Sequence, residues 1–91
     1  LLIDAGWQGG AHFKAMCGGE AFPLDLARAL VARAGSTWNM YGPTETTIWS
    51  TCERLEPGLH KVLIGRPIAN TTIHVLDAQL RQVPVGAVGE L

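Results

Sequence analysis

Two kinds of hydrophobic pattern follow one another in the first half of the chain. FKAMC (residues 13–17) is a short apolar run that ends at two glycines, which predicts a buried strand followed by a loop. PLDLARALVARAG (residues 23–35) repeats its apolar residues at the period of a helix. STWNM (residues 36–40) is again short and β-prone. The order strand, helix, strand predicts two parallel strands of one sheet.

The predicted helix carries signals at both ends. Pro23 suits a first turn, and Asp25 lies where the positive end of the helix dipole favours a carboxylate. Gly35 is a natural stop after the last turn. Arg28 and Arg33 are expected to point to water. The apolar face is expected to consist of Leu26, Leu30 and Ala34, with Ala27 and Val31 beside them.

The second half of the chain has strand-like patterns and no second long helix. TTIWSTCERL (residues 46–55) is β-prone and is closed by a Pro-Gly turn. TTIHVLD (residues 71–77) alternates apolar and polar residues, as a half-buried strand does. We therefore expect an α/β fold with a boundary near residue 60, in which a parallel sheet-helix unit (1–60) is followed by an antiparallel β piece (61–91).

The composition is that of a small folded protein. Of the 91 residues, 47% are hydrophobic and 16% are charged, and the net charge is -1, which is typical of a packed core and not of a disordered tail. A chain of this length buries only a small core. It begins at LLIDAGW without a methionine and stops at VGEL, directly after a glycine turn and a carboxylate. We therefore expect it to be an internal piece of a longer protein.

Several classes of function lack support. There is no cluster of basic residues for a phosphate backbone, so we expect no nucleic-acid partner. No apolar run approaches the roughly 20 residues that span a bilayer, and no signal segment begins the chain, so we expect no membrane partner and a cytoplasmic location. Cys17 and Cys52 are far apart and the histidines are scattered, which indicates buried free thiols rather than a metal site.

One stretch, NMYGPTETT (residues 39–47), gathers chemistry that fills no core. The Tyr41 ring can stack a nucleobase for roughly 1–3 kcal/mol. Gly42 permits close approach, and Pro43 fixes the turn. The Thr44 hydroxyl suits a phosphate oxygen, and Glu45 suits a Mg²⁺ ion that bridges carboxylate and phosphate.

This stretch and CGGEAF (residues 17–22) each follow a predicted strand, where ligands bind in parallel sheets. The residues therefore predict a nucleotide site, although the sequence lacks both the GxxxxGK[ST] and the GxGxxG phosphate loops. The alternative is an ordinary turn followed by a threonine-rich strand.

NMYGPTE resembles the NxYGPTE core motif of amino-acid-activating adenylation domains of nonribosomal peptide synthetases, which are adenylate-forming (AMP-binding) enzymes. The segment before that motif in the family is similar to two runs of this chain, GWQG and FKAMCGGEAFPLDLARAL. The run that leads into the family's GEL motif is similar to IGRPIANTTIHVLDAQLRQVPVGAVGEL. The resemblance covers essentially the whole chain. It implies a fragment of the large N-terminal part of such an enzyme, in which residues 61–91 begin a β-barrel-like subdomain.

The resemblance also implies roles for individual residues. Asn39 and Tyr41 would contact the adenine of ATP together with Gly42, and the strand-end wall beside it would consist of Gly18, Gly19 and Glu20. As the catalytic residues, Thr44 would hold the α-phosphate and Glu45 would bind Mg²⁺.

In the reaction that the family catalyses, the carboxylate of an amino-acid substrate attacks the α-phosphate, which gives aminoacyl-adenylate and pyrophosphate. The acyl group then passes to the phosphopantetheine thiol of a carrier domain, so carrier and condensation domains of the parent synthetase are the implied partners. The fragment alone is expected to be inactive, because it lacks the family's upstream phosphate loop, its substrate and ribose aspartates and its C-terminal lysine domain.

By alignment with the family, the amino-acid pocket is lined by Met16, Gly18, Met40, Ile48 and Trp49. The Trp49 indole would fill volume that a large substrate side chain needs, whereas Gly18 leaves room. The resemblance therefore favours a small substrate, glycine first, with cysteine or alanine next. Alternatively, Trp49 turns into the core and has no bearing on the substrate.

Two other interpretations remain. An acyl- or aryl-CoA ligase carries a related tyrosine-glycine-x-threonine-glutamate stretch, but Pro43, Thr46, Thr47 and the segment GRPIANT resemble the peptide-synthetase branch more closely. The chain could also be a non-catalytic scaffold domain that retains the motif.

Overall fold

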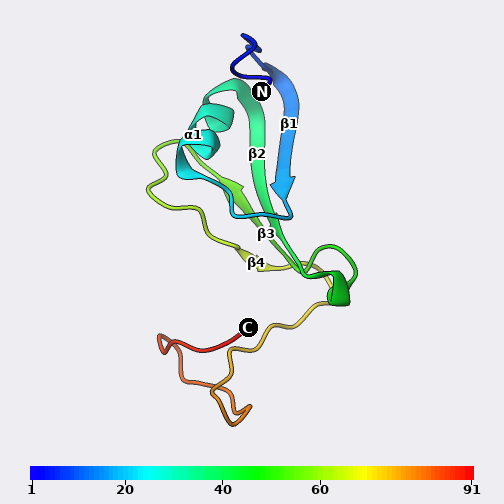
Figure 1. Ribbon diagram of the computed structural model, residues 1–91, viewed down its shortest axis with the longest axis vertical. Coiled ribbons are helices and arrows are strands. Elements are labelled where there is room, and N and C mark those ends of the chain that lie inside the picture. The colour runs from blue at the N-terminus through cyan, green and yellow to red at the C-terminus, as the bar shows by residue number, and fades with distance from the viewer.

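The computed structural model describes residues 1–91 and contains one four-stranded sheet with a single α-helix. Along the chain the elements are β1 (Gly10–Gly18), α1 (Leu24–Arg33), β2 (Ala34–Tyr41), the 3-10 helix η1 (Thr44–Thr46), β3 (Thr51–Leu55) and β4 (Arg66–Pro67). The strand order is β1-β2-β3-β4, with β1 and β2 parallel and the other pairs antiparallel (Figure 1). The predicted α/β fold is confirmed.

Helix α1 begins and ends slightly inside the predicted range. Pro23 is extended and precedes the first helical residue instead of lying in the first turn, whereas Asp25 lies in the first turn as predicted. The helix ends at Arg33 because Ala34 is already extended and pairs with Gly10 of β1. Gly35 is therefore a residue of β2, and the prediction that it stops the helix is wrong.

The core lies between α1 and one face of the sheet. The register places five buried residues on this face, namely Ala15, Thr37, Asn39, Thr51 and Leu55. Ala27 is the helix residue packed against them, with none of its surface exposed. Leu26, predicted to face the core, is 43% exposed because the small Ala27 makes the close contact instead. Arg33 is half-buried and donates to the Ala29 carbonyl at 2.9 Å, so it does not simply point to water.

Residues 56–65 cross the same face of the sheet as α1 and are held there by three side chains. Arg28 of α1 donates from Nε to the Leu59 carbonyl at 3.2 Å. Asn39 of β2 donates from Nδ2 to the Leu63 carbonyl at 2.7 Å, and the Thr51 hydroxyl of β3 donates to the Ile64 carbonyl at 2.5 Å. These bonds join an irregular segment to the sheet and the helix.

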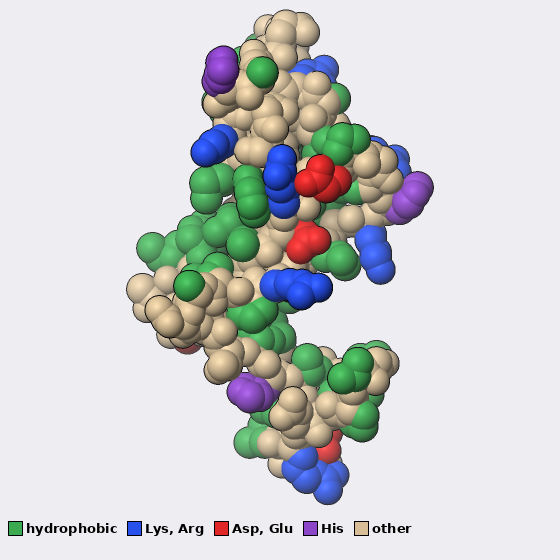
Figure 2. Space-filling view, turned by 180° about the vertical axis from the view of Figure 1, so that it is seen from behind, with side chains coloured by type: hydrophobic (Ala, Val, Ile, Leu, Met, Phe, Trp, Pro, Cys, Tyr) green, Lys and Arg blue, Asp and Glu red, His purple; other side chains and the backbone are tan.

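The opposite face of the sheet has no helix or strand over it. By register, this face carries Met16, Trp38, Met40 and Arg54. The Arg54 guanidinium lies 6.0 Å from the Trp38 ring centroid and pairs with Glu56 at 3.2 Å. In the view from behind, hydrophobic side chains gather at mid-height, over the part of the sheet where β1 ends (Figure 2).

The predicted strand at residues 46–55 begins later than expected, at Thr51. Residues 44–46 form η1, and Thr47 and Ile48 have φ angles of 62° and 77°, which are incompatible with a strand. β3 is therefore only the second half of the predicted element.

The predicted strand at residues 71–77 does not form. Residues 71–75 do alternate between half-buried and exposed, but residues 75–77 are all half-buried. Only Leu76 makes β-bridges, to Gln82 and Glu90, because no neighbouring strand lies alongside the rest. The chain turns at Asp77, whose carboxylate accepts the backbone N–H groups of Gln79 and Arg81 at 2.9 Å. The backbone hydrogen bond from Arg81, with smaller contributions from its guanidinium and from Gln79, lowers the pKa of Asp77.

Beyond Ile68, the C-terminal segment lies apart from the sheet at one end of the long axis of the molecule (Figure 1), which measures 50 Å. The Ile68 amide still donates to the Ser50 carbonyl at 3.0 Å. The boundary near residue 60 and the β-barrel-like nature of residues 61–91 stay predictions. No helix of the structure combines the length and apolar character needed to cross a membrane.

Candidate functional site

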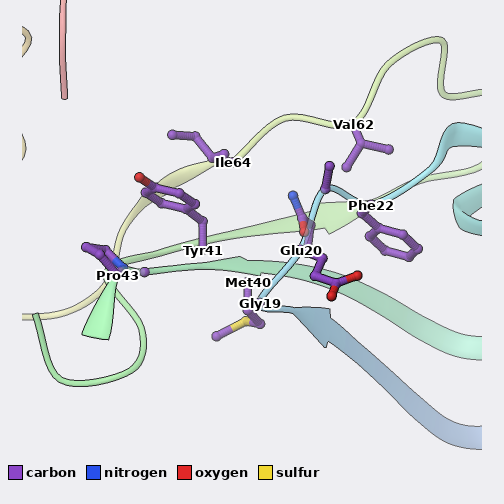
Figure 3. A pocket seen from close by; sticks show the side chains of 11 residues that line it. Gly19, Glu20, Phe22, Met40, Tyr41, Pro43, Val62 and Ile64 are labelled. Atoms are coloured by element: carbon purple, nitrogen blue, oxygen red, sulfur yellow. The ribbon is translucent and has the colours of Figure 1, made fainter. Parts of the chain in front are cut away.

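A cavity of about 590 Å³ opens where β1 and β2 end (Figure 3). The parallel register pairs Cys17 with Asn39 and Gly18 with Met40, so the loops that follow the two strands emerge at the same edge of the sheet. Residues 62–64 form the other side of the cavity. The lining residues are Gly19, Glu20, Ala21, Phe22, Asn39, Met40, Tyr41, Gly42, Pro43, Val62 and Ile64.

Most of the residues predicted to bind the nucleotide line this one cavity. Gly19 and Glu20 come from the loop after β1, and Asn39, Tyr41 and Gly42 come from the end of β2. Gly18 is the last residue of β1 and lies next to the cavity without lining it. Tyr41 is 38% exposed, and its ring points toward Ile64 (Figure 3). The arrangement combines a flat aromatic face with a largely apolar wall.

Asn39 has a structural role that the sequence did not indicate. Its side chain is 6% exposed, and its Nδ2 atom is committed to the Leu63 carbonyl. The amide oxygen makes no hydrogen bond within the chain, so it remains available as an acceptor at the cavity wall. Asn39 therefore both fixes residues 62–64 and offers one polar atom to a ligand.

Thr44 and Glu45 lie in η1, directly after the cavity-lining Pro43, and both side chains are exposed. The side-chain carboxylates that form ion pairs in the structure belong to Asp4, Glu56 and Asp77, so Glu45 is free. No group of three His, Cys, Asp or Glu side chains lies close enough together to hold a metal. A single free carboxylate beside hydroxyls fits Mg²⁺ that takes its remaining oxygen ligands from phosphate and water.

Three of the residues predicted to line an amino-acid pocket, Met16, Gly18 and Met40, lie by register on the other face of the sheet. A Cβ atom at Gly18 would come within 2.5 Å of the Cη2 and Cζ3 atoms of Trp49, so the indole ring lies directly over this glycine. Met40 leaves β2 on the side opposite Tyr41 (Figure 3). Met16 and Ile48 are 64% and 63% exposed, and Met16 lines a separate apolar hollow beside α1.

Gly42 is required by the path of the loop that follows β2. A Cβ atom at Gly42 would lie 2.7 Å from Trp49 Cα and 2.8 Å from the Ser50 backbone nitrogen, which is closer than real Cβ contacts. The loop therefore folds back against Gly42, and this contact places Trp49 beside the end of β1.

Cys17 pairs with the cavity-lining Asn39 in the register of β1 and β2, on the helix side of the sheet. Burial raises the pKa of its thiol, which disfavours the thiolate. The strand ends therefore supply aromatic, amide, hydroxyl and carboxylate groups but no activated nucleophile.

Sequence reasoning missed two lining residues, Val62 and Ile64. Ala21 and Phe22 also line the cavity, and both belong to the segment CGGEAF that was predicted to lie at the ligand-binding edge of the sheet. The only local signal for Val62 and Ile64 is a short apolar run before a glycine, which does not reveal that side chains of β2 and β3 hold this run over the sheet.

Comparison with known proteins places the chain in a family, since residues 8–91 match the AMP-binding enzymes. The chain belongs to the AMP-binding enzyme family. It is 46% identical over 92 residues to the PKS-NRPS hybrid synthetase ATPKS of Aspergillus niger, a match that covers 100% of this chain and 5% of that protein. It is 52% identical over 79 residues to the dimodular nonribosomal peptide synthase of Bacillus subtilis, covering 86% of this chain and 3% of that protein. The chain thus spans a small part of the length of these relatives.

Solved structures of adenylation proteins resemble this one. A four-domain nonribosomal peptide synthetase bound to AMP and glycine superposes with a TM-score of 0.88 at 46% identity, covering 97% of this chain and 7% of that one. The Vibrio cholerae adenylation domain AlmE, in complex with glycyl-adenosine-5'-phosphate, has a TM-score of 0.73 at 23% identity and supports the fold alone.

Substituting Gly42→Ala tests whether the loop must fold back on this residue. We expect a loss of about 1–3 kcal/mol in the free energy of unfolding, because the added methyl group meets backbone atoms that cannot move aside. Gly10→Ala is the matched control, since a Cβ there meets nothing within 4 Å. Urea denaturation of both variants measures the difference, and equal midpoints would contradict the close contact.

Proposed function

We propose that this chain forms part of the ATP site of an amino-acid adenylation domain in a nonribosomal peptide synthetase. The observation that carries the proposal is the cavity at the strand ends, which gathers Asn39, Tyr41 and Gly42 and is followed along the chain by η1 with the unpaired carboxylate of Glu45. The AMP- and glycine-bound synthetase with a TM-score of 0.88 supports the same assignment. The reaction is attack of an amino-acid carboxylate oxygen on the α-phosphorus of ATP, which forms aminoacyl-adenylate and releases pyrophosphate.

On this proposal, each residue acts through position and charge. The adenine ring lies in the cavity against Tyr41, and the Asn39 amide oxygen accepts a hydrogen bond from it. The Thr44 hydroxyl donates to the α-phosphate. Glu45 holds Mg²⁺, which neutralises phosphate charge when bound. Such a reaction needs alignment and electrostatic stabilisation and no side-chain nucleophile, which agrees with the groups present.

The amino-acid substrate we propose is small, with glycine first. The support is the contact between Trp49 and Gly18, because the indole ring already occupies the space that the glycine leaves. Met40 lies on the same face, next to Gly18 in the register. A large substrate side chain would have to displace the indole, whereas glycine would not.

The acyl acceptor we propose is the phosphopantetheine thiol of a carrier domain in the parent synthetase. A condensation domain of the same synthetase is the second partner that we propose. The support is that the relatives are multidomain synthetases, of which this chain spans 5% or less in two cases. The location proposed for such an enzyme is the cytoplasm.

Glu45→Gln tests the metal role. The 91 residues replace the matching segment of the four-domain synthetase, and this chimera is assayed for amino-acid-dependent ATP–pyrophosphate exchange. We expect the substitution to lower kcat by about 100-fold and to raise the Mg²⁺ concentration for half-maximal rate, since a charge that stabilises the transition state is lost. Glu56→Gln, which removes an exposed carboxylate paired with Arg54, is the control and is expected to leave the exchange rate unchanged. Full activity of Glu45→Gln would refute the metal role.

Trp49→Ala in the same chimera tests the substrate proposal. We expect the ratio of kcat/KM for leucine over glycine to rise at least tenfold, because removal of the indole opens the space over Gly18. Trp38→Ala is the matched control, since that indole stacks with Arg54 on the same face of the sheet but farther from the strand end. An unchanged preference for glycine in Trp49→Ala would show that the indole does not set substrate size.

The isolated 91-residue chain is proposed to be inactive. Its buried hydrophobic residues are only Ala15, Ala27 and Leu55, and the opposite face of the sheet has no covering element. We therefore expect no pyrophosphate exchange above background from the purified chain under conditions in which the chimera is active. Exchange that depends on an added amino acid would contradict this expectation.

A further inference from the structure

Loop 42–50 connects β2 to β3 and carries two sets of proposed functional residues. Thr44 and Glu45 lie near its start, and Ile48 and Trp49 lie near its end. The Ser50 amide donates to the Tyr41 carbonyl at 2.8 Å and closes the loop where the strands meet. The proposed phosphate side and the proposed amino-acid side therefore depend on the shape of one short loop.

The loop backbone adopts a conformation that its residues disfavour. Thr47 and Ile48 have φ angles of 62° and 77°, in the left-handed region that β-branched residues rarely adopt. The Trp49 amide donates to the Thr47 carbonyl at 3.1 Å, which closes a tight turn around Ile48. A backbone of this kind persists only where surrounding interactions hold it.

Two hydroxyl groups supply those interactions. Thr46 Oγ1 donates to the Pro43 carbonyl at 3.0 Å and lies 2.5 Å from Ser50 Oγ. A hydroxyl has one proton, and that of Thr46 is used on Pro43, so Ser50 is the donor to Thr46. Ser50 is only 7% exposed. A relay of hydrogen bonds thus runs from Ser50 through Thr46 to Pro43 and joins the end, the middle and the start of the loop.

We propose that the Thr46–Ser50 hydroxyl pair positions the two halves of the site relative to each other. Glu45 directly precedes Thr46, and Trp49 directly precedes Ser50. The hydrogen bond between the two hydroxyls therefore fixes the distance between Glu45 and Trp49. The expected effect on catalysis rests on the proposed adenylation function. The expected effect on the conformation of loop 42–50 does not depend on that function. Thr46 and Ser50 are positioning residues, because they act through Glu45 and Trp49.

Thr46→Val in the chimera removes both side-chain hydrogen bonds at nearly constant volume. We expect kcat to fall about tenfold, and the half-saturating concentrations of glycine and Mg²⁺ to rise about three- to tenfold. Changes of this size match the net free energy of one or two hydrogen bonds. The KM for ATP should rise less than these two half-saturating concentrations, because Asn39 and Tyr41, which contact the adenine on the proposed function, precede the loop. A substitution that merely lowered the amount of folded enzyme would reduce the apparent kcat and leave these constants unmoved.

Two further variants serve as controls. Thr47→Val removes a neighbouring, exposed hydroxyl for which the structure gives no hydrogen bond, and it should behave like the unmodified chimera. Thr46→Ser keeps the hydroxyl. Its kcat and half-saturating concentrations should stay within about threefold of those of the unmodified chimera. Equal behaviour of Thr46→Val and Thr47→Val would overturn the proposal.

Hydrogen–deuterium exchange without ligands tests the loop independently of catalysis. We expect Thr46→Val to speed exchange of the Thr47, Trp49 and Ser50 amides at least tenfold, since their hydrogen bonds depend on the loop shape, while amides of the β2–β3 ladder stay protected. Unchanged loop exchange would overturn the positioning role. The two proposals can fail separately. If the unmodified chimera shows no ATP–pyrophosphate exchange but hydrogen exchange of the loop amides responds as expected, the proposed adenylation function is wrong and the structural role of the hydroxyl pair stands.

Discussion

Parallel pairing of β1 with β2 is the constraint on which the site depends. It places Gly18 opposite Met40, so the glycine-rich loop after one strand and the Tyr41 loop after the other open at the same edge of the sheet. Two strands can run parallel only if the connection between them returns to the starting edge, and α1 makes that crossover. The helix packs through Ala27, whose small side chain permits close approach. Anything that shifts α1 therefore also shifts the cavity.

Polar side chains contribute an unusual share of what holds this chain together. Buried hydrophobic residues are Ala15, Ala27 and Leu55, whereas buried polar residues are Thr37, Asn39, Ser50 and Thr51. Three of these four polar side chains fasten an irregular segment, because Asn39 holds Leu63, Thr51 holds Ile64 and Ser50 holds Thr46. A single such hydrogen bond contributes only about 1 kcal/mol net, but an unpaired buried partner costs about 1–3 kcal/mol. These bonds thus specify where the loops lie more than they stabilise the fold.

Local sequence patterns predict the elements whose stability is local and miss those that depend on distant partners. The β1-α1-β2 unit follows from apolar runs, Asp25 and the helical period, and the cavity residues of β2 follow from the motif around Tyr41. The late start of β3 could not be predicted, since TTI is a favourable strand sequence that the loop holds in 3-10 and left-handed conformations. The strand predicted at 71–77 does not form, since the segment alternates only through residue 75 and has no neighbouring strand to pair with along its length. The lining role of Val62 and Ile64 arises from hydrogen bonds made by residues far away in the sequence.

Side chains alternate between the two faces of the sheet at the end of β2, and this alternation limits which insertions and deletions the strand can tolerate. The side chains of Asn39 and Tyr41 face the helix side of the sheet, where the cavity lies, whereas the Met40 side chain between them leaves the strand on the face that carries Gly18 (Figure 3). Gaining or losing one codon ahead of Asn39 would send each of these side chains to the wrong face of the sheet. A substitution at position 40 therefore alters mainly the surface that carries Gly18, whereas a change in the length of the strand exchanges one ligand surface for the other.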